Sequence, residues 1–302
     1  MRAALLQSYQ KFGDKLRAAT FLAPSLFGVL GLYLVPFVVV GYYALIDSPV
    51  TANFVFLRNF ERVLSNVAFQ IAAQNTLLFS VTAVPLAVGL ALLLAVLLEQ
   101  RIPMKSQLRT FFLSPLMVPV ASIVLIWQVL FHHNGAVNEL LAGIGNLTGW
   151  FTFEPINWFA SAYNQIPIII LFLWRNLGYN MILFLAALAN IPRELLEFAK
   201  LEGAGAPRIF FTVKMRYLSP TLVFVTILSL INSFRVFREV YLLTGPIPYG
   251  RLYMLQHYMN NMFRGLDYQS LAAAAIIMGV VMVAIIGIIF LVENRYGKDV
   301  EG

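Results

Sequence analysis

Long apolar runs alternate with shorter polar segments along most of this chain. Each run reaches about twenty residues or more, the length that an α-helix needs to cross the hydrocarbon core of a bilayer. The pattern predicts an all-α, polytopic membrane protein with a basic N-terminal segment at 1–20, a membrane domain at 21–292 and a cytoplasmic tail at 293–302. Six transmembrane helices are expected at about residues 21–46, 74–98, 110–131, 166–189, 218–237 and 271–292.

The composition agrees with a membrane protein. Hydrophobic residues make up 60% of the chain and charged residues 12%, against about a quarter charged in a soluble domain. The absence of cysteine excludes disulfides, thiolate metal sites and a catalytic thiol. The net charge of +7 does not predict nucleic-acid binding, because the cations lie at the ends of apolar runs.

The distribution of these cations predicts an orientation. If the N-terminus is cytoplasmic, fourteen of the 21 Lys and Arg residues fall in inside segments and five in outside loops. The outside segments, at 47–73, 132–165 and 238–270, are predicted to be polar loops. The positive-inside rule then places both termini and the polar segment 191–217 in the cytoplasm.

The segment 191–217 is predicted to form a helical hairpin. Pro192 suits the first turn of one helix, where a missing N–H costs nothing. Gly203 supplies the break, because glycine tolerates the left-handed geometry of a helix end. Pro207 opens a second short helix. A hairpin of this kind is either a plain connection between spans or a contact for a protein outside the membrane.

The hairpin sequence EFAKLEGA at 197–204, followed by a spaced F-x-x-V and a later Leu-Ser-Pro, resembles the EAA loop of bacterial ATP-driven (ABC) importer permeases. The likeness is greatest to the carbohydrate branch, with its maltose-type and glycerol-phosphate-type permeases. It extends to segments 74–77, 174–192 and 234–245. Glu202 stands where the family has aspartate, and Arg216 stands where it has proline. The resemblance implies that the residues coupling the chain to an ATPase are Glu197, Ala199, Glu202, Gly203, Ala204 and Phe210.

The resemblance also implies the partners and location of the chain. A permease of this family pairs with a second homologous permease, a cytoplasmic ATPase dimer and an extracellular or periplasmic sugar-binding protein. Transport would proceed by alternating access in the bacterial cytoplasmic (inner) membrane, with lipid around the spans and no cofactor. Carbohydrate import is therefore the expected function.

No enzyme chemistry is legible in the sequence. A phosphate-binding loop of the form G-x-x-x-x-G-K-[ST] is absent, so ATP hydrolysis is expected on a partner. His132 and His133 are adjacent and point apart, and no nearby ligand completes a metal shell. We predict no catalytic residues, no metal site and no nucleic-acid partner.

Polar residues at membrane depth are the candidates for the substrate path. Amides pair with sugar hydroxyls, and an aromatic ring stacks on the C–H face of a sugar. The same side chains are also suited to hydrogen bonding between helices, which would be purely structural. The candidates are Trp174, Asn176, Asn180, Asn232 and Arg235.

Two other functions are weighed against import. An ion-coupled secondary transporter is expected to carry carboxylates inside its spans. The predicted spans contain essentially none, since Asp47, Glu99 and Glu293 lie at their ends. A membrane scaffold without transport has no need of the hairpin in this form.

Overall fold

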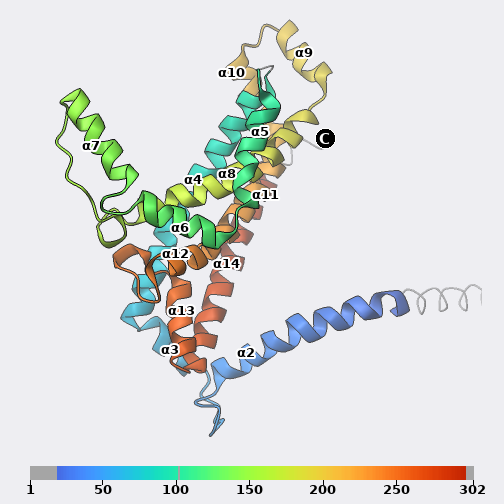
Figure 1. The fold of residues 1–302 in the computed structure, drawn as a ribbon. Helices are drawn as coiled ribbons and strands as arrows, with labels where there is room; N and C mark the ends of the chain where they lie inside the picture. Colours follow the sequence, from blue (N-terminus) through green and yellow to red (C-terminus); the bar gives the residue numbers. More distant parts are fainter. Residues whose placement is uncertain (1–18, 101–102, 297–302) are drawn as a thin grey trace, which may run out of the picture. The chain divides into compact units, whose positions relative to one another are not determined.

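The computed structural model describes residues 19–100 and 103–296, with side chains up to residue 293, and these ranges are predominantly helical (Figure 1). Within them, the only β pairing is a single bridge between Ile46 and Phe54. Most of the predicted N-terminal segment, and the end of the tail, lie outside the described residues. Two compact units are present. One holds the described residues up to Leu64 with Met262–Gly279, and the other holds Ser65–Asn261 with those from Val280 onward.

The first unit begins with a long apolar helix at Ala19–Leu45. Its middle is a π-helical turn, η1 (Leu30–Leu34), followed by α2 (Val35–Leu45). A short helix, α3 (Arg58–Leu64), is tied back to the end of α2. The buried amide of Asn59 donates to the carbonyl oxygens of Ala44 and Ile46, at 3.0 and 2.8 Å.

Three helices form the core of the second unit: α4 (Val67–Glu99), α8 (Gln165–Ala189) and α11 (Met215–Arg235) pack side by side (Figure 1). Lipid tails are as apolar as leucine, so helices associate in a membrane through close packing of small side chains. The sequence of α4 provides these at four-residue spacing, and each is fully buried: Ala83, Ala87, Ala91 and Ala95.

The predicted third span at 110–131 is wrong as a continuous helix. The chain instead forms α5 (Lys105–Leu113), a 3-10 turn η2 (Ser114–Met117) and α6 (Val120–Leu130), with a bend of 101°. Pro115 and Pro119 explain the break, because proline lacks an N–H donor and disfavours helical geometry in the residue before it.

A glycine positions α5 against α8. A Cβ atom built on Gly178 would overlap with the backbone carbonyl of Phe112 in α5. The contact therefore requires a residue without a side chain at this point of α8. Gly89 in α4 differs, since its Cβ would meet nothing within 4 Å.

All three predicted polar loops contain helices, which corrects the sequence expectation: the segment 47–73 holds α3 and the first residues of α4. Helix α4 begins seven residues before the predicted span and is capped by Asn66, which accepts from the backbone N–H groups of Ala68 and Phe69. The segment 132–165 contains α7 (Ala136–Thr148) and η3 (Trp158–Ala160). The segment 238–270 contains most of α12 (Phe237–Thr244), then η5 (Gly250–Leu252), α13 (Leu255–Arg264) and the start of α14 (Tyr268–Tyr296).

Five helical stretches among the described residues are long and apolar enough to cross a membrane, or six if the bent α5–α6 pair counts as one. The fifth predicted span, 218–237, is part of a helical stretch that runs from Ala206 to Thr244. At about 1.5 Å per residue this stretch exceeds the bilayer core of about 30 Å, so its ends extend beyond the hydrocarbon.

Candidate functional site

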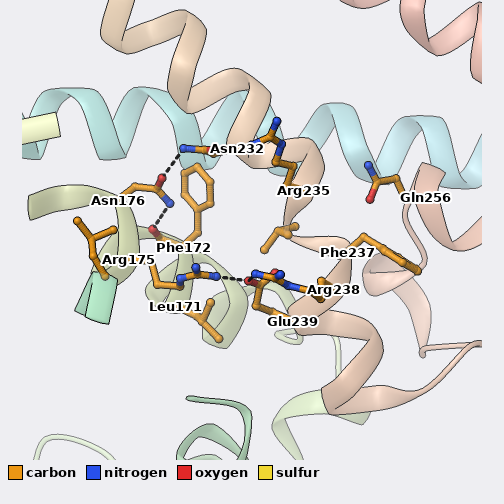
Figure 2. Close-up of a pocket in the computed structure, with 12 residues that line it drawn as sticks. Leu171, Phe172, Arg175, Asn176, Asn232, Arg235, Phe237, Arg238, Glu239 and Gln256 are labelled. Atoms are coloured by element: carbon orange, nitrogen blue, oxygen red, sulfur yellow. Dashed lines mark hydrogen bonds and ion pairs between the residues drawn. The ribbon is translucent and has the colours of Figure 1, made fainter. Parts of the chain in front are cut away.

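A polar cavity of about 480 Å³ lies within the second unit, where α8, α11, α12 and α13 meet (Figure 2). Its apolar lining comes from Leu116, Leu171, Phe172, Val236 and Phe237. Its polar lining includes four charged side chains. Two of these belong to Arg235 and Arg238, which are exposed, the Arg238 side chain to 65%. The polar lining residues are Arg175, Asn176, Asn232, Arg235, Arg238, Glu239 and Gln256.

An ion pair between α8 and α12 forms one wall. The guanidinium of Arg175 donates to Oε1 of Glu239, as Figure 2 shows. The Glu239 side chain is 4% exposed and that of Arg175 26%. Arg238 approaches the same carboxylate oxygen at 3.8 Å. The other oxygen, Oε2, is buried and accepts no hydrogen bond from the described residues.

A pair of amides forms a second wall. Nδ2 of Asn232 donates to Oδ1 of Asn176 at 2.9 Å, linking α11 to α8. The Asn176 amide in turn donates to the carbonyl of Phe172 at 2.8 Å. Both amides line the cavity and also bond to one another. The two interpretations weighed from the sequence, substrate path and interhelical hydrogen bond, are therefore compatible at this position.

The structure brings together three of the five predicted path residues: Asn176, Asn232 and Arg235 all line the cavity. Asn180 lies elsewhere, 1% exposed, with its amide donating to the Ser229 hydroxyl at 2.9 Å. Trp174 packs against Trp127, with ring centroids 5.4 Å apart. Neither of these two residues is part of the cavity lining.

Sequence reasoning missed Glu239 as a site residue, because segment 238–270 was expected to be a loop. The carboxylate belongs to the continuous helical stretch Ala206–Thr244 and is buried. Glu239 lies two residues past the predicted fifth span, so the expectation that carboxylates lie only at the ends of spans stays a prediction, but the structure adds a buried carboxylate to the site. A signal was present: Asn232, Arg235 and Glu239 recur at the three- and four-residue spacing of one helix face.

The predicted hairpin forms α9 (Arg193–Leu201), α10 (Ala206–Ile209) and a π-helical turn η4 (Phe210–Lys214), which lie beyond one end of the core bundle (Figure 1). Its turn is a Schellman motif. Gly203 has φ +77°, and its N–H donates to the Lys200 carbonyl at 3.0 Å. The Ala204 N–H donates to the Ala199 carbonyl, also at 3.0 Å. The small residues of the EAA-like sequence thus close the end of α9.

The outer face of the hairpin is apolar and exposed. Phe198 is 63% exposed and Leu201 86%, while the side chains of Glu197 and Glu202 are also exposed. The base of the hairpin is anchored instead. Ile209 is buried at 7% exposed, and Phe210 is half-buried.

An ion pair joins this base to the end of α4. Nζ of Lys214 lies 2.5 Å from Oε2 of Glu99. Nζ of Lys105 donates to the backbone carbonyl of Glu99 at 3.2 Å. Cations from two predicted cytoplasmic segments therefore gather around one acidic residue.

The family match and the similar proteins all point to one family of transport permeases. Residues 87–298 match the family described as "Binding-protein-dependent transport system inner membrane component". The lactose transport system permease protein LacF of Rhizobium radiobacter is 32% identical over 245 residues, which cover 80% of each chain. The sulfoquinovosyl glycerol transport system permease protein SmoG of Agrobacterium fabrum is 30% identical over 273 residues, covering 88% of this chain and 86% of that one.

The fold is also similar to that of a solved transporter. The structure of a bacterial alginate ABC transporter, in complex with an alginate pentasaccharide-bound periplasmic protein, contains a chain that matches with a TM-score of 0.81 at 20% identity. The match covers 96% of this chain and 98% of that chain. Sequence match, apolar helices and fold agree: the chain belongs to the binding-protein-dependent transport inner membrane component family and is a multi-pass permease of the bacterial inner membrane.

Proposed function

We propose that this chain is one membrane subunit of an ATP-driven carbohydrate importer, and that the cavity on α8, α11 and α12 is part of its translocation path. Relatives named as lactose and sulfoquinovosyl glycerol permeases support carbohydrate as the substrate class. The amides and aromatic rings of the cavity suit a sugar, since they pair with hydroxyls and stack on C–H faces.

The observation that carries the proposal is the continuity between hairpin and cavity. Helix α8 leads into α9, and α10 with η4 leads into α11. A displacement of the hairpin therefore moves the two helices that carry Asn176 and Asn232. This connection would let a partner at the hairpin open or close the cavity.

The partner at the hairpin is proposed to be a cytoplasmic ATPase dimer. An exposed Phe198 and Leu201 on a short amphipathic helix are suited to a hydrophobic cleft on another protein. The chain has no phosphate-binding loop of its own. A second homologous permease and an extracellular or periplasmic sugar-binding protein would complete the assembly.

The topology proposed is six spans with both termini and the hairpin in the cytoplasm, the bent α5–α6 pair counting as one span. The chain has no cysteine, so single cysteines report position without background. A cysteine at Leu201 should react with an impermeant maleimide only from the cytoplasmic side, and one at Leu147 in α7 only from outside. Labelling of Leu201→Cys from outside would overturn the topology.

Purification and reconstitution test the function. The wild-type chain should co-purify with an ATPase, and proteoliposomes of the complex should import a carbohydrate only with ATP. Phe198→Ala combined with Leu201→Ala should lose the ATPase, whereas Leu147→Ala should retain it. Uptake that needs no ATP and stops with a protonophore would instead support ion coupling, for which the buried Glu239 is the candidate.

A further inference from the structure

The charge of the cavity points to a narrower class of substrate. We propose that the cavity selects an anionic carbohydrate, a saccharide or polyol carrying a carboxylate, phosphate or sulfonate group, through Arg235 and Arg238. The inference rests on the proposed function, because it assumes that the cavity belongs to the translocation path.

The first step is the balance of charge. Three guanidinium groups and one carboxylate line the cavity. Glu239 is already engaged by Arg175, and Arg238 reaches the same oxygen only at 3.8 Å. Arg235 has no carboxylate within 4.0 Å among the described residues. Arg235 and Arg238 therefore leave two positive charges without a matching anion.

The second step is the arrangement of these charges. Asn232, Arg235 and Arg238 recur at three-residue spacing along the helical stretch Ala206–Thr244, so they follow one face. That face is turned toward the cavity, since all three residues line it. Charged residues in membrane segments are costly and mark substrate or ion pathways when they face a polar cavity. A stripe of this kind suits an anion in the path.

The third step is chemical complementarity. A guanidinium presents a planar fork that binds carboxylate or phosphate oxygens through two parallel hydrogen bonds. Phe172 and Phe237 line the same cavity and supply aromatic rings for the C–H face of a sugar. Because Arg175 neutralises Glu239, the carboxylate does not cancel the attraction of the other two arginines.

The test is a comparison of matched probes on the whole permease–ATPase complex in nanodiscs, without the binding protein. Galactobiose and digalacturonate share ring and linkage and differ in carboxylate. Glucose and glucose 1-phosphate form a second matched pair, which differs by a phosphate group. We expect at least one anionic probe to bind roughly tenfold or more tightly than its neutral counterpart, with an affinity that falls as salt rises. Equal or weaker binding of both anionic probes, or no binding of any probe, would overturn the inference.

Variants locate the effect. Arg235→Gln combined with Arg238→Gln should weaken the anionic probe by roughly tenfold or more and change the neutral probe by less than about twofold. The double lysine variant should retain part of the preference, and the exposed Arg264→Gln should retain all of it. If the glutamine variant fails to assemble, the wild-type comparison decides alone.

Different experimental results would exclude the inference and the proposed function. If neutral carbohydrates are taken up with ATP, and the double glutamine variant does not change this uptake, the proposed function stands and an anionic substrate is excluded. The arginines would then be expected to meet carboxylates of the second permease. Absence of ATP-dependent uptake for every carbohydrate would remove the proposed function itself.

Discussion

Replacing Arg175 by methionine tests how the ion pair holds the cavity wall together. The substitution leaves Glu239, whose side chain is 4% exposed, without its main partner, and Arg238 lies 3.8 Å away. Breaking a buried ion pair from one side costs about 3–5 kcal/mol. Glu239→Gln should cost less, about 1–2 kcal/mol, because Arg175 is 26% exposed and keeps water as a partner.

The double variant Arg175→Met with Glu239→Gln should be more stable than Arg175→Met alone, since it leaves no uncompensated buried charge. The apparent coupling between the two sites should be about 2 kcal/mol in a double-mutant cycle. Thermal unfolding of the purified complex in nanodiscs measures this, at about 2–4 °C per kcal/mol. The reasoning would be refuted if Arg175→Met were no less stable than Glu239→Gln and if the destabilisation of the double variant equalled the sum of the two single effects.

Three further predictions concern helix contacts, the hairpin and pH. Gly178→Ala should lower the unfolding temperature of the complex, because overpacking costs about 1–3 kcal/mol. Gly89→Ala, the control, should leave that temperature unchanged or raise it. Equal changes in unfolding temperature for the two variants would contradict the contact of α5 with α8. Gly203→Ala should cost about 1–2 kcal/mol, because alanine resists a positive φ, and should lower transport-coupled ATPase activity, whereas Gly205→Ala, with φ −70°, should not. Burial lowers the pKa of His257, in α13 outside the candidate spans, to about 4 from 6.5, so the folded state keeps it neutral. The contribution of His257 to the free energy of unfolding should be complete above about pH 6.5 and fall by about 1.4 kcal/mol per pH unit as pH drops toward 4. The unfolding temperature should therefore fall more between pH 7 and pH 5 in the wild type than in His257→Gln. An equal fall in the two proteins would contradict this.

The sequence alone determined the features that depend on local chemistry. The membrane spans could be predicted because an uninterrupted apolar run of about twenty residues has the length of a helix that crosses the bilayer core. The hairpin is legible because Pro192, Gly203 and Pro207 restrict the backbone wherever they occur. The small residues of the EAA-like sequence also fix their own geometry, since a Schellman turn is closed by bonds within six residues.

The tertiary structure decided which polar residues meet. Arg175 and Glu239 are 64 residues apart, and Asn176 and Asn232 are 56 apart. Their pairing depends on how α8, α11 and α12 pack, which no local pattern specifies. The same packing kept Trp174 and Asn180 out of the cavity lining for two different reasons. Trp174, two residues before Asn176, points to another face of α8 and packs on Trp127. Asn180 lies on the same face as Asn176 but one turn further along α8, where its amide bonds to Ser229.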